Sequence, residues 1–395
     1  MIRERRRAVL AASAIVFGMI ALVLAGGYID WNFMHYREAT IRSHLGHLQV
    51  SRAGYRDSGV ADPFAYILDD DTTSTNALRA IEGVRLLAPR LAFSGLISLG
   101  DNTVSFVGEG VDPAMERELS TNLLIVAGET LSEEAPREVI LGEGLAASVG
   151  ASVGDTVVLL STTSSGGVNG VEVKVRGLFA SVAKAFDDTA LRVPIGLARE
   201  LLRVSGSHTW VLLLDATSAT DAVAGKVIQR LPADGYEVTP WTQLADFYNK
   251  SAALLAKQML VMRVIIALII VLSISNVMTM SVMERTSDIG TAMAMGARRT
   301  LVLRRFLAEG LVLGALGGAA GLVLAIFSAY LISAIGIPSP PPPGMTRGYT
   351  AGILLTPGLL AGAFALSITT TLVASLYPAW RASRLVIIDA LRFNR

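Results

Sequence analysis

The sequence has no cysteine and few histidines. Without a cysteine among its 395 residues, the chain can form no disulfide, thiolate metal site, cysteine nucleophile or acylated lipobox. Among four histidines, only His44 and His47 have a spacing that could hold a metal, and no HExxH motif or second ligand pair accompanies them. We therefore expect them to have a polar surface or strand-entry role.

Motifs for nucleotide binding and catalysis are also missing. Glycines are frequent in residues 108–154, but no GxxxxGK[ST] loop is present to hold nucleotide phosphates. There is no GxSxG elbow, and Asp69–Asp71 lack the spacing of a calcium loop, so a solvated turn is expected there. The sequence predicts a non-enzymatic chain that binds no cofactor, and any energy for work must come from a partner.

Charged residues are scarce for a soluble protein. Only 17% of residues are charged, 52% are hydrophobic, and the net charge is +1. The mean hydropathy is +0.52, which is high for a soluble globule and low for a fully embedded bundle. A few membrane spans with one soluble domain fit this balance, and nothing indicates a nucleic-acid partner.

Four apolar segments are long enough to cross about 30 Å of hydrocarbon. They are Ala8–Ile29, Val264–Met283, Phe306–Ile337 and Ala351–Tyr377. A cleaved signal peptide is the alternative for the first segment. We favour a span, because the apolar run is long for a signal peptide and Trp31, Phe33 and Tyr36 follow it as an interfacial belt would.

Arginine placement predicts the orientation. Basic clusters lie before the first span (Arg3, Arg5, Arg6, Arg7), between the second and third (Arg285, Arg298, Arg299, Arg304, Arg305) and after the fourth (Arg381, Arg384, Arg392, Arg395). The short connection between spans three and four carries only Arg347. By the positive-inside rule, both termini and the segment after span two face the cytoplasm.

About 220 residues of ordinary soluble composition separate the first two spans. Short strand-like runs recur at 47–52, 96–100, 156–160, 171–179 and 210–215, and helical patterns at 74–82, 113–124, 195–204 and 218–231. The stretch SSGGVNG at 164–170 is typical of a hairpin tip. The predicted fold is an α-helical membrane protein of four transmembrane helices, with a large α+β periplasmic domain, of one or two lobes, inserted between helices 1 and 2.

Residues 284–299, ERTSDIGTAMAMGARR, form the connection between spans two and three. A helix over 284–303, capped by Thr286 or Ser287, would place Ile289, Ala292, Met293, Gly296 and Thr300 on one face. Gly290 and Gly296 weaken such a helix and indicate either close approach to another surface or a break. The pattern alone leaves open a partner-docking helix or a helix lying on the inner leaflet.

Three blocks resemble the permeases of the MacB/LolC/FtsX group of ABC transporters, which use the type VII fold. The first runs from Asn276 through ERTSDIGTAMAMGARR to FLAEG at 306–310; Asp288 stands where the family often has Glu. The second is LGEGLAASVGASVGDTVVL at 141–159, and the third is YPAWRASRLVIIDALR at 377–392, with isoleucine where proline is common. The resemblance covers the whole chain and its topology.

The resemblance implies a half-transporter that couples ATP hydrolysis in the cytoplasm to work on the outer side. Its expected partners are a dimer of ABC ATPase subunits, which bind the ATP and Mg, and a second permease copy or sister permease. A periplasmic chaperone or adaptor and membrane lipid are further candidates. The expected ATPase-coupling residues are Glu284, Arg285, Asp288, Ile289, Gly290, Met293, Gly296 and Ala297.

Two further groups are assigned to the third span. Gly314, Gly317, Gly318 and Gly321 have the small-residue spacing of close helix packing. Glu309 lies near the cytoplasmic end, and Arg305, four residues earlier, is its predicted ion-pair partner. A structural salt bridge is favoured over a proton relay.

The proline-rich stretch IPSPPPPGMTRGY at 337–349 and GHLQV at 46–50 look like those of lipoprotein-releasing permeases, which use a hook loop to recruit a carrier. The main functional prediction is therefore lipoprotein or lipid extraction from the inner membrane. Alternatives are a tripartite-efflux permease for drugs, peptides or other small molecules, a signalling permease that controls cell-wall hydrolases, and a membrane-anchored enzyme.

The predicted boundaries follow from these assignments. The N-terminus and first span occupy 1–30, the periplasmic domain 31–253, the second span 254–283 and the coupling segment 284–305. The third span occupies 306–337, the outer loop 338–350, the fourth span 351–379 and the cytoplasmic tail 380–395. The protein is expected in the inner membrane.

Overall fold

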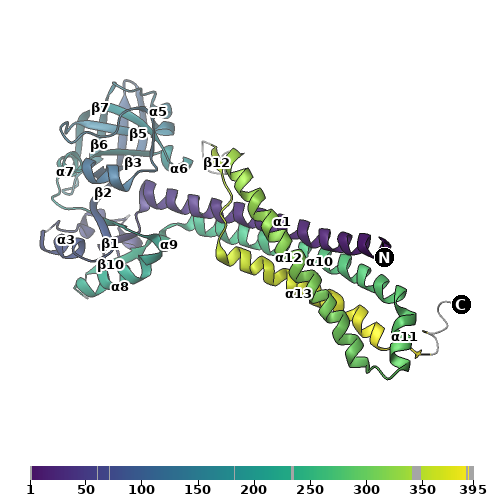
Figure 1. Cartoon of the computed structure of the whole chain (residues 1–395). Coiled ribbons are helices and arrows are strands. Elements are labelled where there is room, and N and C mark those ends of the chain that lie inside the picture. The colour runs from purple at the N-terminus through teal and green to yellow at the C-terminus, as the bar shows by residue number, and fades with distance from the viewer. Residues whose placement is uncertain are drawn as a thin grey trace. The chain divides into compact units, whose positions relative to one another are not determined.

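The computed structural model describes residues 2–59, 61–70, 72–181, 183–232, 235–339, 348–387 and 390. Four of its helices have the length and apolar composition of membrane spans. They are α1 (Ile2–Thr40), α10 (Asp246–Glu284), α12 (Arg299–Ile335) and α13 (Pro357–Ser383), shown in Figure 1. Each continues beyond the predicted apolar segment at one or both ends, because hydropathy marks the lipid-embedded part of a helix and not its hydrogen-bonded ends.

The chain divides into two compact units. Of the described residues, a membrane unit contains those within 1–34, 251–339 and 350–395, and an outer unit contains those within 35–250 and 348–349. The membrane unit buries one apolar core that draws on all four long helices, including Ile15, Ile274, Phe306 and Ala374. Exposed apolar side chains remain along α10 and α12, as expected for helices in contact with lipid or with another subunit.

Helices α12 and α13 approach closely through glycine. A methyl group added at Gly314 would lie 2.1 Å from Thr371 Oγ1, and one at Gly318 would lie 2.9 Å from Ser367 Oγ. On the other side, Gly317 meets Ile15 and Gly321 meets Met19 of α1. The four glycines assigned to packing therefore lie at two helix contacts, α12–α13 and α12–α1.

The outer unit contains a closed barrel. Its six strands are β2 (Val84–Leu99), β3 (Asn102–Val111), β8 (Ala190–Pro194), β5 (Glu138–Gly142), β7 (Val168–Ala180) and β6 (Thr156–Thr162). The ring closes because β6 pairs with both β7 and β2. Helices α5 (Glu143–Val149) and α7 (Ile195–Leu202) contribute Leu145 and Leu201 to its apolar core. The strand pattern predicted an α+β domain but not this closure.

A second lobe shares strand β2. The first half of β2 pairs with β9 (Thr209–Leu214), which continues to β1 (Leu48–Arg52) and β10 (Tyr236–Pro240). Helices α3 (Thr72–Arg79) and α8 (Thr220–Arg230) bury Leu78 and Val227 in the core of this lobe. The 16 residues of β2 thus belong to both lobes.

The remaining elements are short. In the outer unit they are the π-helix Ile41–Leu45, α2 (Tyr55–Ser58), the 3₁₀ turns Pro63–Tyr66 and Thr217–Ala219, α4 (Pro113–Leu119), β4 (Leu124–Gly128), α6 (Lys184–Asp187) and α9 (Trp241–Leu244). The predicted hairpin tip is the turn between β6 and β7, where Val168 is 77% exposed. Strands β11 (Ile337–Ser339) and β12 (Tyr349–Ala351) flank the proline-rich stretch, whose residues 340–347 lie outside the described part.

The aspartate run is not a solvated turn throughout. Asp69 is exposed, but Asp70 accepts hydrogen bonds from Ser207 Oγ at 2.6 Å and Trp210 Nε1 at 2.7 Å and pairs with Arg199. No local pattern indicates this role, because the three donors lie more than 125 residues away along the chain. Within the described residues, no group of three or more His, Cys, Asp or Glu side chains could hold a metal ion.

His47 is a buried structural residue. Its Nδ1 accepts from the amide of Leu214 at 3.1 Å, so the proton is on Nε2, which lies 3.0 Å from Thr217 Oγ1. Burial is the largest cause that lowers the pKa of His47 to about 4; Glu38 opposes it, and Arg42 and Arg37 act in the same direction as burial. His47 directly precedes β1, as the strand-entry alternative predicted, but the surface alternative is wrong for this residue, since it is 1% exposed.

Gly314→Ala should destabilise the membrane unit. The added methyl group meets the buried Thr371, and overpacking of this kind costs about 1–3 kcal/mol. Gly362→Ala in α13 is the matched control, because no atom lies within 4 Å of its added methyl group. Thermal unfolding in mild detergent should show a lower midpoint for the first variant only, and equal midpoints would contradict the close contact.

His47 predicts a pH-dependent stability of the outer unit. A histidine whose pKa falls from about 6.5 to about 4 on folding stabilises the fold above pH 6.5. That contribution, about 3 kcal/mol at most, is lost as the pH falls from 6.5 towards 4. Denaturant titrations of the full chain, followed by tryptophan fluorescence, should show a steeper loss over this range in the wild type than in His47→Gln. Parallel curves would refute the assignment.

Candidate functional site

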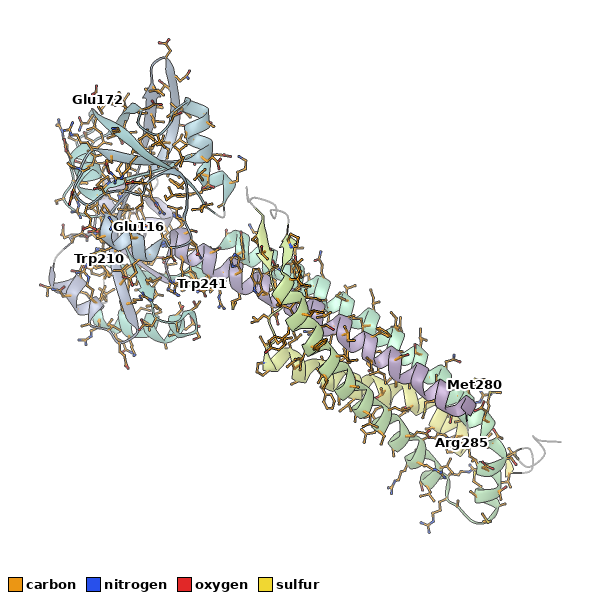
Figure 2. All side chains as sticks on the ribbon, turned by 45° about the horizontal axis from the view of Figure 1, so that its top comes forward. Glu116, Glu172, Trp210, Trp241, Met280 and Arg285 are labelled. Atoms are coloured by element: carbon orange, nitrogen blue, oxygen red, sulfur yellow. The ribbon has the colours of Figure 1, made fainter. Side chains whose placement is uncertain are left out.

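The connection between α10 and α12 folds as a short helix, α11 (Thr286–Ala294). It lies at the same end of the helical bundle as the start of α1, and Figure 2 shows Arg285 at this end. Arg285 occupies the N-cap position and makes no side-chain cap, while Thr286 Oγ1 donates to Val282 O at 2.9 Å. The predicted capping by Thr286 or Ser287 is therefore not observed.

A Schellman motif ends α11 before the predicted position. The amide of Ala297 donates to Ala292 O at 3.0 Å, and that of Gly296 to Met293 O at 3.1 Å. Gly296 has φ +98°, a left-handed conformation that glycine adopts without a steric penalty. The helix predicted over 284–303 is thus broken at Gly296, and α12 begins at Arg299. Of the two meanings proposed for this glycine, a break is the one observed.

One face of α11 packs inward. Ile289 and Met293 are 8% and 9% exposed, and Gly290 is buried beside them. The two side chains join the membrane core together with Met278 and Val282 of α10 and Phe306 of α12. Three of the residues expected to contact a partner therefore hold α11 against its own bundle.

The opposite side of this connection is an exposed ridge formed by Glu284, the last residue of α10, Asp288 and Thr291 of α11, and Met295 at the end of α11. The spacing of three and four residues between Asp288, Thr291 and Met295 places these three on one side of a helix. Met295 is 79% exposed, the carboxylates of Glu284 and Asp288 lie near the positive N-terminal end, and Gly296 and Arg298 continue the exposed surface. This ridge, with two carboxylates and one thioether, is the exposed surface of the connection between α10 and α12.

Glu309 of α12 pairs with Arg285, whose Nη1 lies 3.6 Å from Glu309 Oε2. The structure thus gives this carboxylate a different cation from the predicted Arg305, which lies on the same helix as Glu309. Both side chains are about one-third exposed, so the pair contributes modestly to stability. Its geometric effect is to connect the start of α11 to α12.

A cleft of about 150 Å³ lies beside the start of α11. It is lined by Thr279, Val282, Met283, Thr286, Pro378, Arg381, Leu385 and Ala390. The lining comes from α10, α11, the end of α13 and the segment after α13. This places part of the YPAWRASRLVIIDALR block next to the α10–α11 junction, a proximity that the sequence did not reveal.

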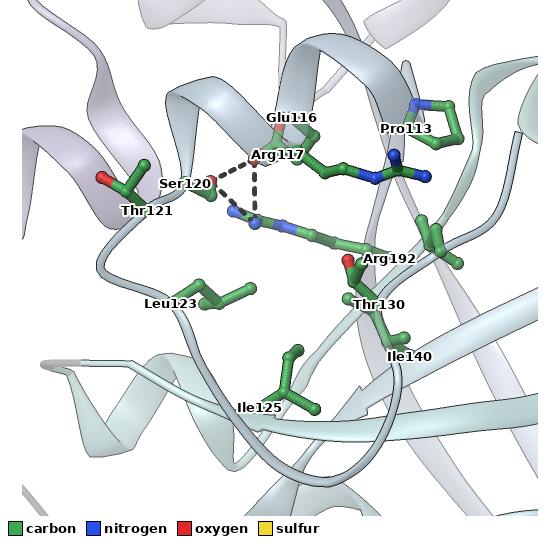
Figure 3. A pocket seen from close by; sticks show the side chains of 11 residues that line it. Pro113, Glu116, Arg117, Ser120, Thr121, Leu123, Ile125, Thr130, Ile140 and Arg192 are labelled. Atoms are coloured by element: carbon green, nitrogen blue, oxygen red, sulfur yellow. Dashed lines mark hydrogen bonds and ion pairs between the residues drawn. The ribbon is translucent and has the colours of Figure 1, made fainter.

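The outer unit has a second cavity, of about 360 Å³, between α4 and the strands below it (Figure 3). Apolar side chains of Leu123, Ile125 and Ile140 form one wall. On the other side, Arg192 Nη1 donates to Ser120 Oγ at 3.1 Å and lies 2.9 Å from Glu116 Oε1. Ser120 Oγ also donates to Glu116 Oε1, so these three polar groups are bonded to one another.

Two family profiles match consecutive parts of the chain. The MacB-like periplasmic core domain matches residues 8–230, and the FtsX-like permease C-terminal domain matches residues 260–387. The first match includes α1 and most of the outer unit, and the second includes α11 and its ridge.

Curated relatives match over shorter segments. The macrolide export ATP-binding/permease protein MacB of Syntrophobacter fumaroxidans is 32% identical over 161 residues, which are 41% of this chain and 21% of that protein. The pyoverdine export ATP-binding/permease protein PvdT of Pseudomonas syringae pv. tomato is 28% identical over 212 residues, 52% of this chain and 30% of that protein. The chain thus matches less than a third of the length of either relative.

A solved structure is also similar to the outer part of the chain. The periplasmic region of MacB from Actinobacillus actinomycetemcomitans is 13% identical, with a TM-score of 0.37, and the match covers 53% of this chain and 95% of that structure.

Proposed function

This chain belongs to the MacB/FtsX-like family of ABC-transporter permeases, and we propose that it receives work from a separate cytoplasmic ATPase through α11 and delivers it on the outer side. The observation that carries the proposal is the exposed ridge of α11 within a family-matched permease domain, on a helix whose other face is fixed in the bundle. Both termini and α11 are proposed to face the cytoplasm, as the arginine distribution indicates.

The contacts of α11 support transmission of a push. Because Ile289 and Met293 lie in one apolar core with Met278 and Phe306, displacement of α11 must displace α10 and α12. The Arg285–Glu309 pair adds a polar connection between α11 and α12. Close packing of α12 against α13 and α1 then extends the movement to the whole membrane unit.

We propose export of a small molecule as the task, in a tripartite assembly with a periplasmic adaptor and an outer-membrane duct. The names of the relatives, macrolide and pyoverdine exporters, support this alternative better than lipoprotein or lipid release. Release rests on the resemblance of GHLQV and of the proline-rich stretch, most of which lies outside the described residues. None of the relatives named above is described as a signalling protein, so we do not propose a signalling role.

Further partners belong to the same proposal. A second permease copy or sister permease would cover part of the exposed apolar surface of α10 and α12, and lipid would cover the rest. The exposed apolar residues of α10 include Leu254, Val261, Ile265, Leu268 and Leu272. The chain itself is proposed to bind no cofactor, with ATP and Mg held by the ATPase.

Purification of the tagged full chain from its native membrane tests the function. An ABC ATPase should co-elute in mild detergent, and the chain alone should hydrolyse no ATP. A co-eluting adaptor and duct would support export, whereas co-eluting lipoproteins would move the assignment to release. Absence of any ATPase across several detergents would refute the proposed coupling.

The ridge of α11 gives the next prediction. Glu284→Lys combined with Asp288→Lys should weaken ATPase association at least about tenfold, equivalent to about 1.4 kcal/mol, because it reverses both carboxylates of the ridge. Thermal stability of the permease should fall less than it does when the buried Ile289 is truncated, because Glu284 and Asp288 are both exposed. Glu172→Lys, an exposed carboxylate of the outer unit, is the matched control.

Ile289→Ala separates the two faces of α11. It removes a buried side chain, so it should lower stability by about 2–5 kcal/mol through a cavity in the bundle. Co-purification with the ATPase and thermal unfolding distinguish variants of the exposed ridge, which should lose ATPase binding, from variants of the buried face, which should lose stability. Equal ATPase binding by the ridge variant and the wild type would exclude the ridge as the docking surface.

A further inference from the structure

Four charged side chains are buried together in the outer unit, away from α11. They are Arg90 of β2, Glu109 of β3, Glu116 of α4 and Arg192 of β8, each at most 9% exposed. Arg192 Nε lies 2.9 Å from Glu109 Oε2, and its Nη1 lies 2.9 Å from Glu116 Oε1. Arg90 Nη2 lies 2.7 Å from Glu116 Oε1. We refer to these four residues as the ion cluster.

The ion cluster holds the chain segment that follows α1. Arg192 Nη2 donates to Ser43 O at 3.0 Å, and Arg90 Nη1 donates to His44 O. Ser120, after α4, adds a donor to Ser43 O at 3.2 Å. His44 Nδ1 lies 3.2 Å from Glu109 Oε1. Backbone and side chain of this segment are thus fixed by elements of the barrel.

The segment is the last turn of the helix that crosses the membrane. Helix α1 runs to Thr40 and continues as the π-helix Ile41–Leu45, which ends at Gly46. Carbonyl groups at a helix end lack partners within the helix. Here Arg192 and Arg90 donate hydrogen bonds to two of these carbonyl groups. Asn122 N also donates to Arg42 O at 3.1 Å. A π-turn is uncommon and frequently marks a functional position.

Local sequence positions the cluster. Asp112 caps α4 by accepting from the amides of Ala114 and Met115, at 3.0 and 3.1 Å, and Pro113 occupies the first helical position. This fixes the start of a seven-residue helix that carries Glu116. Figure 3 shows the guanidinium of Arg192 reaching Glu116 and Ser120 at the edge of the outer cavity.

Stability alone is a weak reason for such a cluster. Buried ion pairs often stabilise a protein no more than apolar side chains of similar volume, but removal of one partner leaves an uncompensated charge. Burial by itself raises the pKa of Glu109, yet His44, Arg90 and Arg192 hold it well below its usual value. Glu109 is therefore ionised throughout the physiological range, and the cluster keeps its bonds to the segment after α1.

We propose that the ion cluster is the mechanical joint that makes a movement of α1 a movement of the barrel, with Arg90, Glu109, Glu116 and Arg192 as positioning residues. The proposal rests on the proposed function, in which ATP drives the membrane helices. The four residues come from strands β2, β3 and β8 and from helix α4, so a displacement of residues 42–44 would pull on all four elements at once. An apolar contact would allow the helix end to slide, whereas hydrogen bonds of fixed direction do not.

The Asp70 group supplies a matched control. It also joins a carboxylate to an arginine, a serine and a tryptophan inside the outer unit, but Asp70, Arg199, Ser207 and Trp210 bond to one another and not to residues 41–45. A variant of this group tests whether any loss of a partly buried acid–arginine contact has the same effect.

The test is hydrogen–deuterium exchange of the full chain in complex with its co-purified ATPase, with and without ATP and vanadate, which trap the ATPase with ADP and vanadate bound. In the wild type, trapping should change amide exchange in α10–α12 and also in β3 and β8. In Glu109→Gln/Arg192→Gln, which removes one charge of each sign, the change in α10–α12 should persist and most of the change in β3 and β8 should be lost. Asp70→Asn should retain both changes.

A covalent bond between the same elements should restore the lost change. Because the chain has no cysteine, Arg42→Cys with Asn122→Cys can be oxidised selectively in the background of the double glutamine variant. Restoration in the oxidised and not the reduced state would assign the loss to the joint and not to misfolding. Where the double glutamine variant fails to fold, Ser120→Ala removes one donor to Ser43 O and is expected to reduce the β3 and β8 response partially.

Failure of the joint and failure of the proposed function give different results. If amide exchange in α10–α12 of the wild type is the same with and without ATP and vanadate, the proposed function is refuted, and so is the proposed joint. If the wild type responds throughout and the glutamine variant or the Ser120→Ala variant responds equally in β3 and β8, the joint alone is refuted. A loss of response in Asp70→Asn equal to that of the cluster variant would also refute it.

Discussion

The close approach of α12 and α13 is the contact on which the membrane unit depends. In hydrocarbon, apolar side chains gain little by leaving lipid for another helix, so association relies on close packing and interhelical hydrogen bonds. Gly314 provides both, because it admits Thr371 and its carbonyl accepts from Ser367 Oγ at 3.1 Å. The hydroxyl of Thr371 bonds back to Ser367 O at 2.9 Å, so the buried polar groups have partners.

Because α12 is fixed in this way, α11 packs against a rigid part of the bundle. Its inner face enters the core through Ile289 and Met293, while its outer ridge carries Glu284, Asp288 and Met295. In the proposed function the two faces have different roles, since the inner face would transmit movement to the bundle and the outer face would contact the ATPase. A helix held only by lipid contacts would move with the membrane surface and transmit little.

The outer unit is organised around β2, which pairs with β9 in one lobe and with β3 and β6 in the other. Arg90 lies where these two pairings meet. From there it reaches both Glu116 and the backbone after α1. A displacement of residues 42–44 would therefore act on β2, the strand common to both lobes. This is why the ion cluster could couple the helix end to the whole outer unit.

The sequence by itself determined the four spans, the α+β outer domain, the β6–β7 hairpin and the position of the connection between spans two and three. These follow from local composition, since a run of about 20 apolar residues or an alternation of two is visible without neighbours. The family resemblance named the block that carries the site. Only the tertiary structure decided which face of α11 is exposed, that Glu309 pairs with Arg285, and that Asp70, Glu109, Arg192 and the end of α1 lie in buried networks. Those outcomes depend on groups separated by tens to more than a hundred residues, and a helical pattern indicates that a face is apolar without saying whether its own chain or a partner covers it.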